Sequence, residues 1–177
     1  MYITILLLPK SRNNMEKNIH IVKDAKGYKI VVLPEVVFKN RQNIDWKAVE
    51  VYLQKYVGEM VMVQETGDIV FIGTEFPDEY KGSKYTVRLK GAIAKAKANA
   101  SQGIKELLEI ATNRRFYENQ KRKHAYKARK GWYYYTTRFA LPIYENDKKT
   151  EFYNVYTASL LVKLREIIKN IFMIWLT

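Results

Sequence analysis

The chain contains no cysteine, and its other shortages each exclude a class of site. With no cysteine among 177 residues, disulfides, thiolate metal ligands and cysteine nucleophiles are excluded together. His20 and His124 are the two histidines, too few for a dedicated zinc site. We therefore expect no cofactor and a reducing compartment such as the cytoplasm.

Long hydrophobic runs and glycine-rich phosphate loops are also missing. The apolar run in residues 1–8 lacks the basic leader of a signal peptide and is too short to cross a bilayer. The run 167–176 is interrupted by Lys169 and is also too short. The second run predicts a core helix, with membrane contact as the minor alternative. Residues 67–73 form a strand pattern and not a Walker or Rossmann loop. We therefore expect no membrane partner.

The first part of the chain alternates strand and helix patterns. Residues 28–38 are rich in Val and Ile and predict a strand, and Asp45 predicts the cap of a helix over residues 46–56. Residues 59–73 predict a β-hairpin. Met15 follows a polar stretch and could be the natural start, so residues 1–17 are expected to be a flexible or alternative-start segment.

The second part predicts helices followed by long strands. Residues 86–112 are helical with a break at Gly103, residues 114–130 show no strand periodicity, and residues 132–144 and 152–162 predict a hairpin. We expect the α+β class, with helices preceding an antiparallel sheet in one compact domain over residues 18–177.

Positive charge is concentrated in residues 81–130. This window holds fifteen Lys or Arg and three acids, whereas the rest of the chain is close to neutral. Such a field fits a dense polyanion, so we predict a nucleic-acid surface, with a merely solvated face as the alternative. The predicted surface comprises Lys84, Arg88, Lys95, Lys105, Arg114, Arg115, Arg122, Lys123, Lys127, Arg129 and Lys130, with Tyr134 as a stacking ring for unpaired bases. The Tyr133–Tyr135 run first of all fits strand residues that fill a core, with base stacking as the second possibility.

The predicted hairpin has a testable register. If it is centred on residues 145–149, paired residue numbers add to about 295, which sets Arg138 across from Thr157 and Thr136 across from Ser159. These four residues and Tyr134 would share one face. Tyr135, Thr137 and Phe139 would share the other with Tyr156, Ala158 and Leu160, which resembles a core face.

The first of these faces carries groups that metal-free RNA cleavage requires. His124 would carry the proton, Arg138 would clamp the phosphate, Ser159 and Thr157 would add hydrogen bonds, and Lys121 lies nearby in sequence. The plain alternative for His124 is a solvated surface residue. Asp68, Glu75, Asp78 and Glu79 raise the alternative of a divalent-metal nuclease site, although residues 76–80 equally predict a capped helix.

A family resemblance covers residues 43–162. Its motifs are GDIVFIG at 67–73, FPDEY at 76–80, AKAKANA at 94–100, GWY at 131–133 and RFALP at 138–142. This stretch resembles uncharacterised proteins of Clostridia and their mobile elements, and is similar to phage-associated nucleases grouped with barnase, EndoU, the tRNase colicins and RelE. The resemblance implies a small α+β fold and metal-independent RNA cleavage by His, Arg or Lys, and Ser or Thr. The sequence after Leu164 departs from the group, in which a further strand would be expected.

The leading hypothesis is a phage or mobile-element endoribonuclease that cuts a host RNA, such as a tRNA or a CRISPR guide RNA, as a toxin or counter-defence factor. It would act in the cytoplasm of a bacterial host cell. The rival is a non-enzymatic anti-CRISPR inhibitor that occupies a Cas nuclease or its guide RNA. A DNA-binding regulator is a third hypothesis, weakened by the lack of a helix-turn-helix pattern. The oligomeric state is left open.

Overall fold

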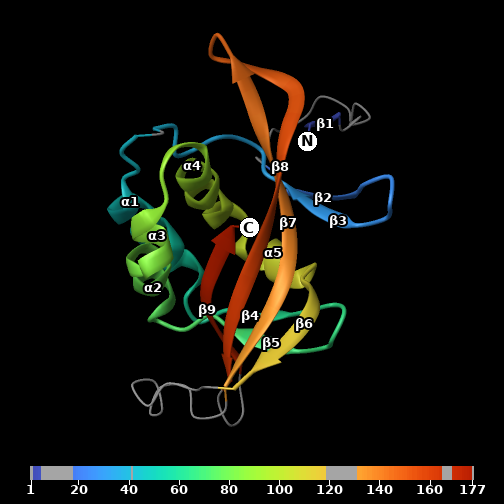
Figure 1. The fold of residues 1–177 in the computed structure, drawn as a ribbon, viewed down its shortest axis with the longest axis vertical. Coiled ribbons are helices and arrows are strands. Elements are labelled where there is room, and N and C mark those ends of the chain that lie inside the picture. Colours follow the sequence, from blue (N-terminus) through green and yellow to red (C-terminus); the bar gives the residue numbers. More distant parts are fainter. Residues whose placement is uncertain (1, 5–17, 41, 119–130, 165–168, 177) are drawn as a thin grey trace.

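The computed structural model describes residues 2–4, 18–40, 42–118, 131–164 and 169–176. The fold is α+β, as predicted, and helices precede the long strands of a curled sheet. In Figure 1 most of the helices gather on one side, while two long strands run the height of the molecule. The helices are α1 (Trp46–Leu53), α2 (Phe76–Gly82), α3 (Lys84–Arg88), α4 (Gly91–Ala100) and α5 (Ile104–Glu109).

The described strands form one mostly antiparallel sheet. They are β1 (Tyr2–Thr4), β2 (His20–Lys23), β3 (Lys29–Val32), β4 (Met60–Met62), β5 (Ile69–Phe71), β6 (Thr112–Tyr117), β7 (Trp132–Glu145), β8 (Lys148–Leu164) and β9 (Lys169–Leu176). The order is β2-β3-β7-β8-β9-β5-β4, with β1 on β8 and β6 on β7. The β3–β7 and β5–β9 pairs are parallel.

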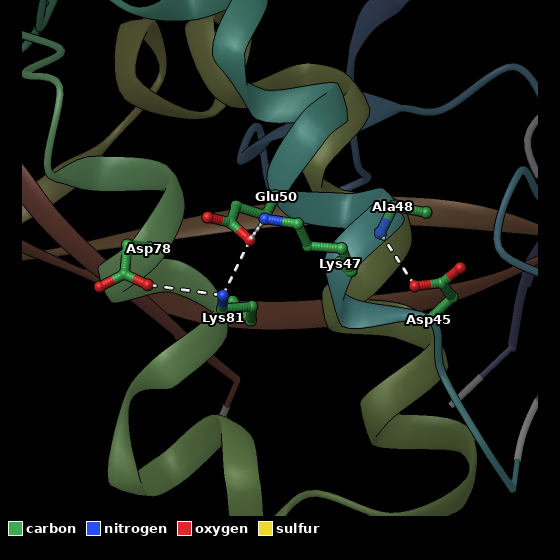
Figure 2. A network of polar contacts seen from close by, with 6 residues as sticks. All are labelled: Asp45, Lys47, Ala48, Glu50, Asp78 and Lys81. Atoms are coloured by element: carbon green, nitrogen blue, oxygen red, sulfur yellow. Dashed lines mark hydrogen bonds and ion pairs between the residues drawn. The ribbon is translucent and has the colours of Figure 1, made fainter.

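Helix α1 forms where the sequence predicts it. Asp45 accepts a hydrogen bond from the amide of Ala48 at 2.9 Å, and Val49 and Leu53 are buried on the predicted apolar side. Figure 2 shows that Lys81 of α2 contacts Glu50 of α1 at 2.8 Å. The ion pair joins the two helices at a partly buried position.

The β7–β8 hairpin has the predicted register. Thr136 pairs with Ser159 and Arg138 with Thr157. The tight turn is Asn146-Asp147, with φ of 48° and 61°, which is shorter than the predicted polar turn and is compensated by a bulge near Pro142. The predicted core face is confirmed, because Tyr135, Thr137, Phe139, Ala158 and Leu160 are buried and Tyr156 packs against them.

Two predictions about local structure are wrong. Residues 169–176 form strand β9 and not a helix, because they extend the sheet from β8 to β5. Residues 112–117 form strand β6 against β7, although the sequence shows no strand periodicity from residue 114 onward. Tyr2–Thr4 pair with Phe152–Asn154 of β8, and the flexible or alternative-start segment over residues 1–17 stays a prediction.

Candidate nucleic-acid interface

The two faces of β7 separate the core from a polar surface. We call the side of Tyr135, Thr137 and Phe139 the inner face, and the side of Tyr134, Thr136 and Arg138 the outer face. The inner face packs on the helices, whereas all three outer-face side chains are half-buried. Antiparallel pairing also places Ser159 and Thr157 of β8 on the outer face. The structure therefore brings Arg138, Thr157 and Ser159 together, as predicted.

Arg138 has an ion-pair partner that the sequence analysis missed. Its Nη1 lies 2.6 Å from Oδ2 of Asp24, in the turn between β2 and β3, and its guanidinium lies 5.7 Å from the Tyr28 ring centroid. The Arg138 hydrogen bond lowers the pKa of Asp24, so this carboxylate is ionised at neutral pH. A phosphate would have to displace Asp24 to reach the Arg138 side chain at this contact.

A cavity of about 1010 Å³ lies over this part of the outer face. Its floor is formed by Thr136, Arg138 and Thr157, and Ser159 lies outside its lining. Its walls are the β2–β3 turn (24–29), residues 64–65 of the β4–β5 turn, and residues 109–113, which lead from α5 into β6.

Hydrogen bonds tie the walls of the cavity to one another. Lys29 donates through Nζ to Oε1 of Gln64, and Gln64 Nε2 donates to Oε1 of Glu109 at 2.6 Å. The amide of Asn113 donates to Glu65 at 2.9 Å. These contacts connect all three walls, and the charged groups around the cavity are balanced. They are Asp24, Glu65 and Glu109 against Lys26, Lys29 and Arg138.

Strand β6 carries an exposed aromatic surface next to the cavity. Phe116 is 51% exposed and Tyr117 is 49% exposed. The Phe116 and Tyr133 ring centroids lie 5.7 Å apart, and those of Tyr117 and Tyr134 lie 4.7 Å apart, both edge to face. Phe116 and Tyr133 lie on the inner side of the strands and Tyr117 and Tyr134 on the outer face, so we call only Tyr117 and Tyr134 the β6 aromatic surface.

Arg115 completes the outer side of this surface. It pairs with Tyr134 across the strands, so Arg115, Tyr117 and Tyr134 share the outer face. Burial raises the pKa of Tyr134, and the nearby tyrosines Tyr85 of α3 and Tyr117 raise it further. Tyr134 is thus a neutral ring beside an exposed guanidinium.

The β6 strand depends on a glycine at the start of β7. Gly131 has φ of 95°, and a Cβ at this position would lie 2.7 Å from the carbonyl oxygen of Tyr117 and 2.8 Å from the Phe116 ring. Only glycine allows this close approach of the two backbone segments without strain. The close packing against β6 therefore explains the glycine of the GWY motif.

Two of the predicted RNA-binding cations already have acidic partners. Arg114 contacts both carboxylate oxygens of Asp68, at 3.0 and 2.8 Å, and its guanidinium lies 4.9 Å from the Tyr133 ring centroid. Lys105 lies 2.7 Å from Glu59. These two side chains stabilise the fold. The charge count of residues 81–130 therefore overstated the number of cations that are free to bind RNA.

Other predicted cations remain exposed. Lys84, Arg88 and Arg115 are exposed, and none has an acidic partner in the described part of the chain. Lys95 is half-buried. Lys84 and Arg88 flank Tyr85 on α3, the helix that influences Tyr134. Arg115 is the exposed cation on the aromatic surface itself.

Seven of the seventeen predicted site residues lie outside the described residues. This set comprises His124, Lys121, Arg122, Lys123, Lys127, Arg129 and Lys130, which belong to residues 119–130. In the sequence these residues join β6 to β7 and carry six Lys or Arg and no acid. The proton-carrier role of His124 stays a prediction.

Asp68, the first residue of the alternative divalent-metal site, has a structural role. Asp68 is buried and also accepts a hydrogen bond from the Tyr135 hydroxyl, so it joins the β4–β5 turn to β6 and β7. Asp78 lies 3.5 Å from Lys81, while Glu75 and Glu79 belong to the start of α2. Over the described residues, no three carboxylates or histidines lie close enough to hold a metal ion.

The helical layer contains a buried lysine that the sequence analysis did not single out. Lys97 of α4 is fully buried, donates to the Thr86 hydroxyl, and lies 4.8 Å from the Tyr80 ring centroid. Burial lowers the pKa of Lys97 to about 7. The alternation of Ala and Lys in residues 94–98 gave no signal that one lysine faces the core.

Comparisons with protein-family models, curated proteins and solved structures gave no match to this chain. In the part of the chain that the structure describes, every helix is too short or too polar to cross a bilayer.

Proposed function

We propose that this protein binds single-stranded RNA through the β6 aromatic surface and Arg115. The observation that carries the proposal is the Tyr117–Tyr134 pair, two partly exposed rings at 4.7 Å on the same face as an exposed arginine. Unpaired bases stack on such rings whatever their identity, and arginine contacts the phosphates between them. The six cations of residues 119–130 follow β6 directly in the sequence and add to the attraction.

Single strands fit this surface better than a duplex. A duplex buries its base faces in the stack, so exposed rings on a strand edge would find no partner there. The protein would then act by occupying an RNA, such as a tRNA or a CRISPR guide RNA, in the cytoplasm of a bacterial host cell. Inhibition of a host RNA-guided nuclease is one consequence of that occupancy.

Fluorescence anisotropy with a labelled single-stranded RNA of twelve nucleotides tests the binding. Tyr117→Ala and Tyr134→Ala should each weaken binding about tenfold, the effect of losing one stacked base. Tyr144→Ala is the matched control, because Tyr144 is also exposed but lies near the far turn of the β7–β8 hairpin. Equal affinity of all three variants and the parent would refute the aromatic surface.

Metal-independent endoribonuclease activity is the second candidate. It is favoured by one observation, the register that places Arg138, Thr136 and Thr157 on the floor of one cavity. Phosphate transfer needs such cationic and hydroxyl donors around the developing charge. Incubation with total bacterial RNA should then give discrete fragments with cyclic phosphate ends in the presence of EDTA. Intact RNA combined with Tyr134-dependent binding would leave occupancy as the function.

A further inference from the structure

The cavity and the aromatic surface lie along one path on β7. Tyr134, Thr136 and Arg138 occupy alternate positions, so their side chains project from the same face. Two residues of a strand span about 7 Å, which puts Arg138 roughly 13 Å beyond Tyr134. An RNA strand stacked on Tyr134 can therefore place a neighbouring nucleotide at the cavity.

The walls of the cavity suit a ligand that carries both an anion and hydrogen-bond donors. A simple anion would meet Arg138, Lys26 and Lys29 but also the carboxylates of Glu65 and Glu109. A nucleotide offers both kinds of group, a phosphate for the cations and base N–H groups for carboxylate and amide oxygens. The cavity volume, about 1010 Å³, also exceeds what a lone phosphate would fill.

The mouth of the cavity offers an aromatic ring. Tyr28 belongs to the lining, is 60% exposed, and lies against the Arg138 guanidinium at 5.7 Å. A base entering the cavity can stack on this ring while its phosphate meets Arg138. Arg138 keeps 22% of its side chain exposed, so it can be reached from the solvent.

Asp24 holds the place of that phosphate in the free protein. Its Oδ2 lies 2.6 Å from Arg138, while its Oδ1 accepts the amides of Lys26 and Tyr28, each at 2.9 Å. Oδ1 of Asp24 therefore stabilises the turn, and Oδ2 forms the ion pair with the Arg138 guanidinium. A phosphate oxygen makes the same charge-assisted bond as a carboxylate oxygen and can replace it.

We infer that the cavity holds one nucleotide unit of a bound RNA, with its phosphate on Arg138 in place of the Asp24 carboxylate. The inference rests on the proposed RNA binding, because the aromatic surface delivers the strand to the cavity. Asp24 then sets the affinity of the cavity, since each binding event must break the Asp24–Arg138 ion pair.

Titration of the full chain with the four 5′-mononucleotides, by calorimetry, tests the inference, with inorganic phosphate and unphosphorylated nucleosides as separate probes. Mononucleotides should bind more tightly than either probe. Asp24→Asn is the informative variant, because asparagine keeps an oxygen for the Lys26 and Tyr28 amides but gives up the negative charge. It should tighten mononucleotide binding by about fivefold or more, since the competing ion pair is gone. Misfolding cannot imitate a gain in affinity.

Two further variants separate this inference from the proposed function. Arg138→Gln should weaken mononucleotide binding about tenfold, the loss of a charge-assisted contact. Tyr134→Ala should leave mononucleotide binding unchanged while it weakens oligonucleotide binding. If mononucleotides bind neither the parent nor Asp24→Asn, although oligonucleotide binding depends on Tyr134, the cavity assignment is wrong and the proposed function stands. If mononucleotide binding depends on Asp24 and Arg138, but oligonucleotide binding ignores Tyr134, the cavity assignment is supported and the aromatic surface is not.

Discussion

An aspartate–arginine pair lies on each side of β7, and the two pairs differ in what surrounds them. On the inner side, the buried carboxylate of Asp68 in the β4–β5 turn accepts from the Tyr135 hydroxyl and from Arg114, whose side chain is 38% exposed. On the outer side, Asp24 and Arg138 meet beside a cavity. Asp24 and Arg138 line that cavity, whereas neither Asp68 nor Arg114 belongs to its lining. The same chemistry therefore stabilises the fold on one face and can be exchanged on the other.

Two polar groups, one on the inner side of β7 and one in the helical layer, have fixed protein partners. Asp68 and Lys97 are both buried with protein partners. The outer face holds half-buried groups beside a cavity and a row of rings. Substitutions on the inner side should change the free energy of unfolding, and substitutions on the outer side should change ligand affinity.

The largest expected effect is on the inner pair. Asp68→Ala leaves the Tyr135 hydroxyl without an acceptor and frees Arg114, so the free energy of unfolding should fall by about 3 kcal/mol. Glu65→Ala is the matched control, because Glu65 lies in the same turn and also contacts the β6 segment, but at an exposed position. Urea unfolding should show a loss below about 1 kcal/mol for that control. Equal losses for the two variants would remove the distinction between the inner pair and an ordinary surface contact.

The buried lysine gives a smaller effect with a defined pH dependence. Burial lowers the pKa of Lys97 to about 7 from its ordinary value of 10.5, so between these values the unfolded chain binds a proton that the folded chain does not. The free energy of unfolding should therefore decrease as pH falls from 10.5 to 7 and level off below 7.

Lys97→Met should remove that pH dependence and stabilise the protein at pH 7 by about 2 kcal/mol, because it replaces a buried charge by an apolar chain of similar size. Urea unfolding at several pH values measures both effects. Lys90→Met at the exposed start of α4 is the control and should keep the slope. If the free energy of unfolding of Lys97→Met keeps this pH dependence, a group other than Lys97 causes it.

The sequence predicted the local parts of this architecture well. Asp45 and its helix, the β4–β5 hairpin and the register of β7 with β8 follow from caps, turns and alternation, all of which act between near neighbours. The outer-face group of Arg138, Thr157 and Ser159 followed from that register.

Contacts between distant segments could not be predicted in the same way. Asp24 reaches Arg138 over 114 residues, and Arg114 reaches Asp68 over 46, so neither pair leaves a mark in local spacing. Strand β9 was mistaken for a helix because its short apolar run, residues 171–176, fits a buried strand and a buried helix equally. Strand β6 was missed because its residues are mostly exposed and do not alternate.

The smallest expected effect uses two neighbouring threonines on opposite faces of β7. Thr137 is buried on the inner face, and its hydroxyl has no hydrogen-bond partner in the part of the chain that the structure describes. Thr137→Val should therefore stabilise the protein by about 1 kcal/mol, because it removes an unpaired buried hydroxyl at nearly constant shape.

Thr136→Val on the outer face should shift the free energy of unfolding by less than about 0.5 kcal/mol, since Thr136 is only half-buried. It should weaken mononucleotide binding instead, because it removes a hydroxyl from the cavity floor. Thermal unfolding and calorimetric titration of both variants give the two readouts. Because Thr137 also belongs to the cavity lining, a loss of nucleotide affinity in Thr137→Val would mean that its unpaired hydroxyl serves the ligand, and that the two faces share the site.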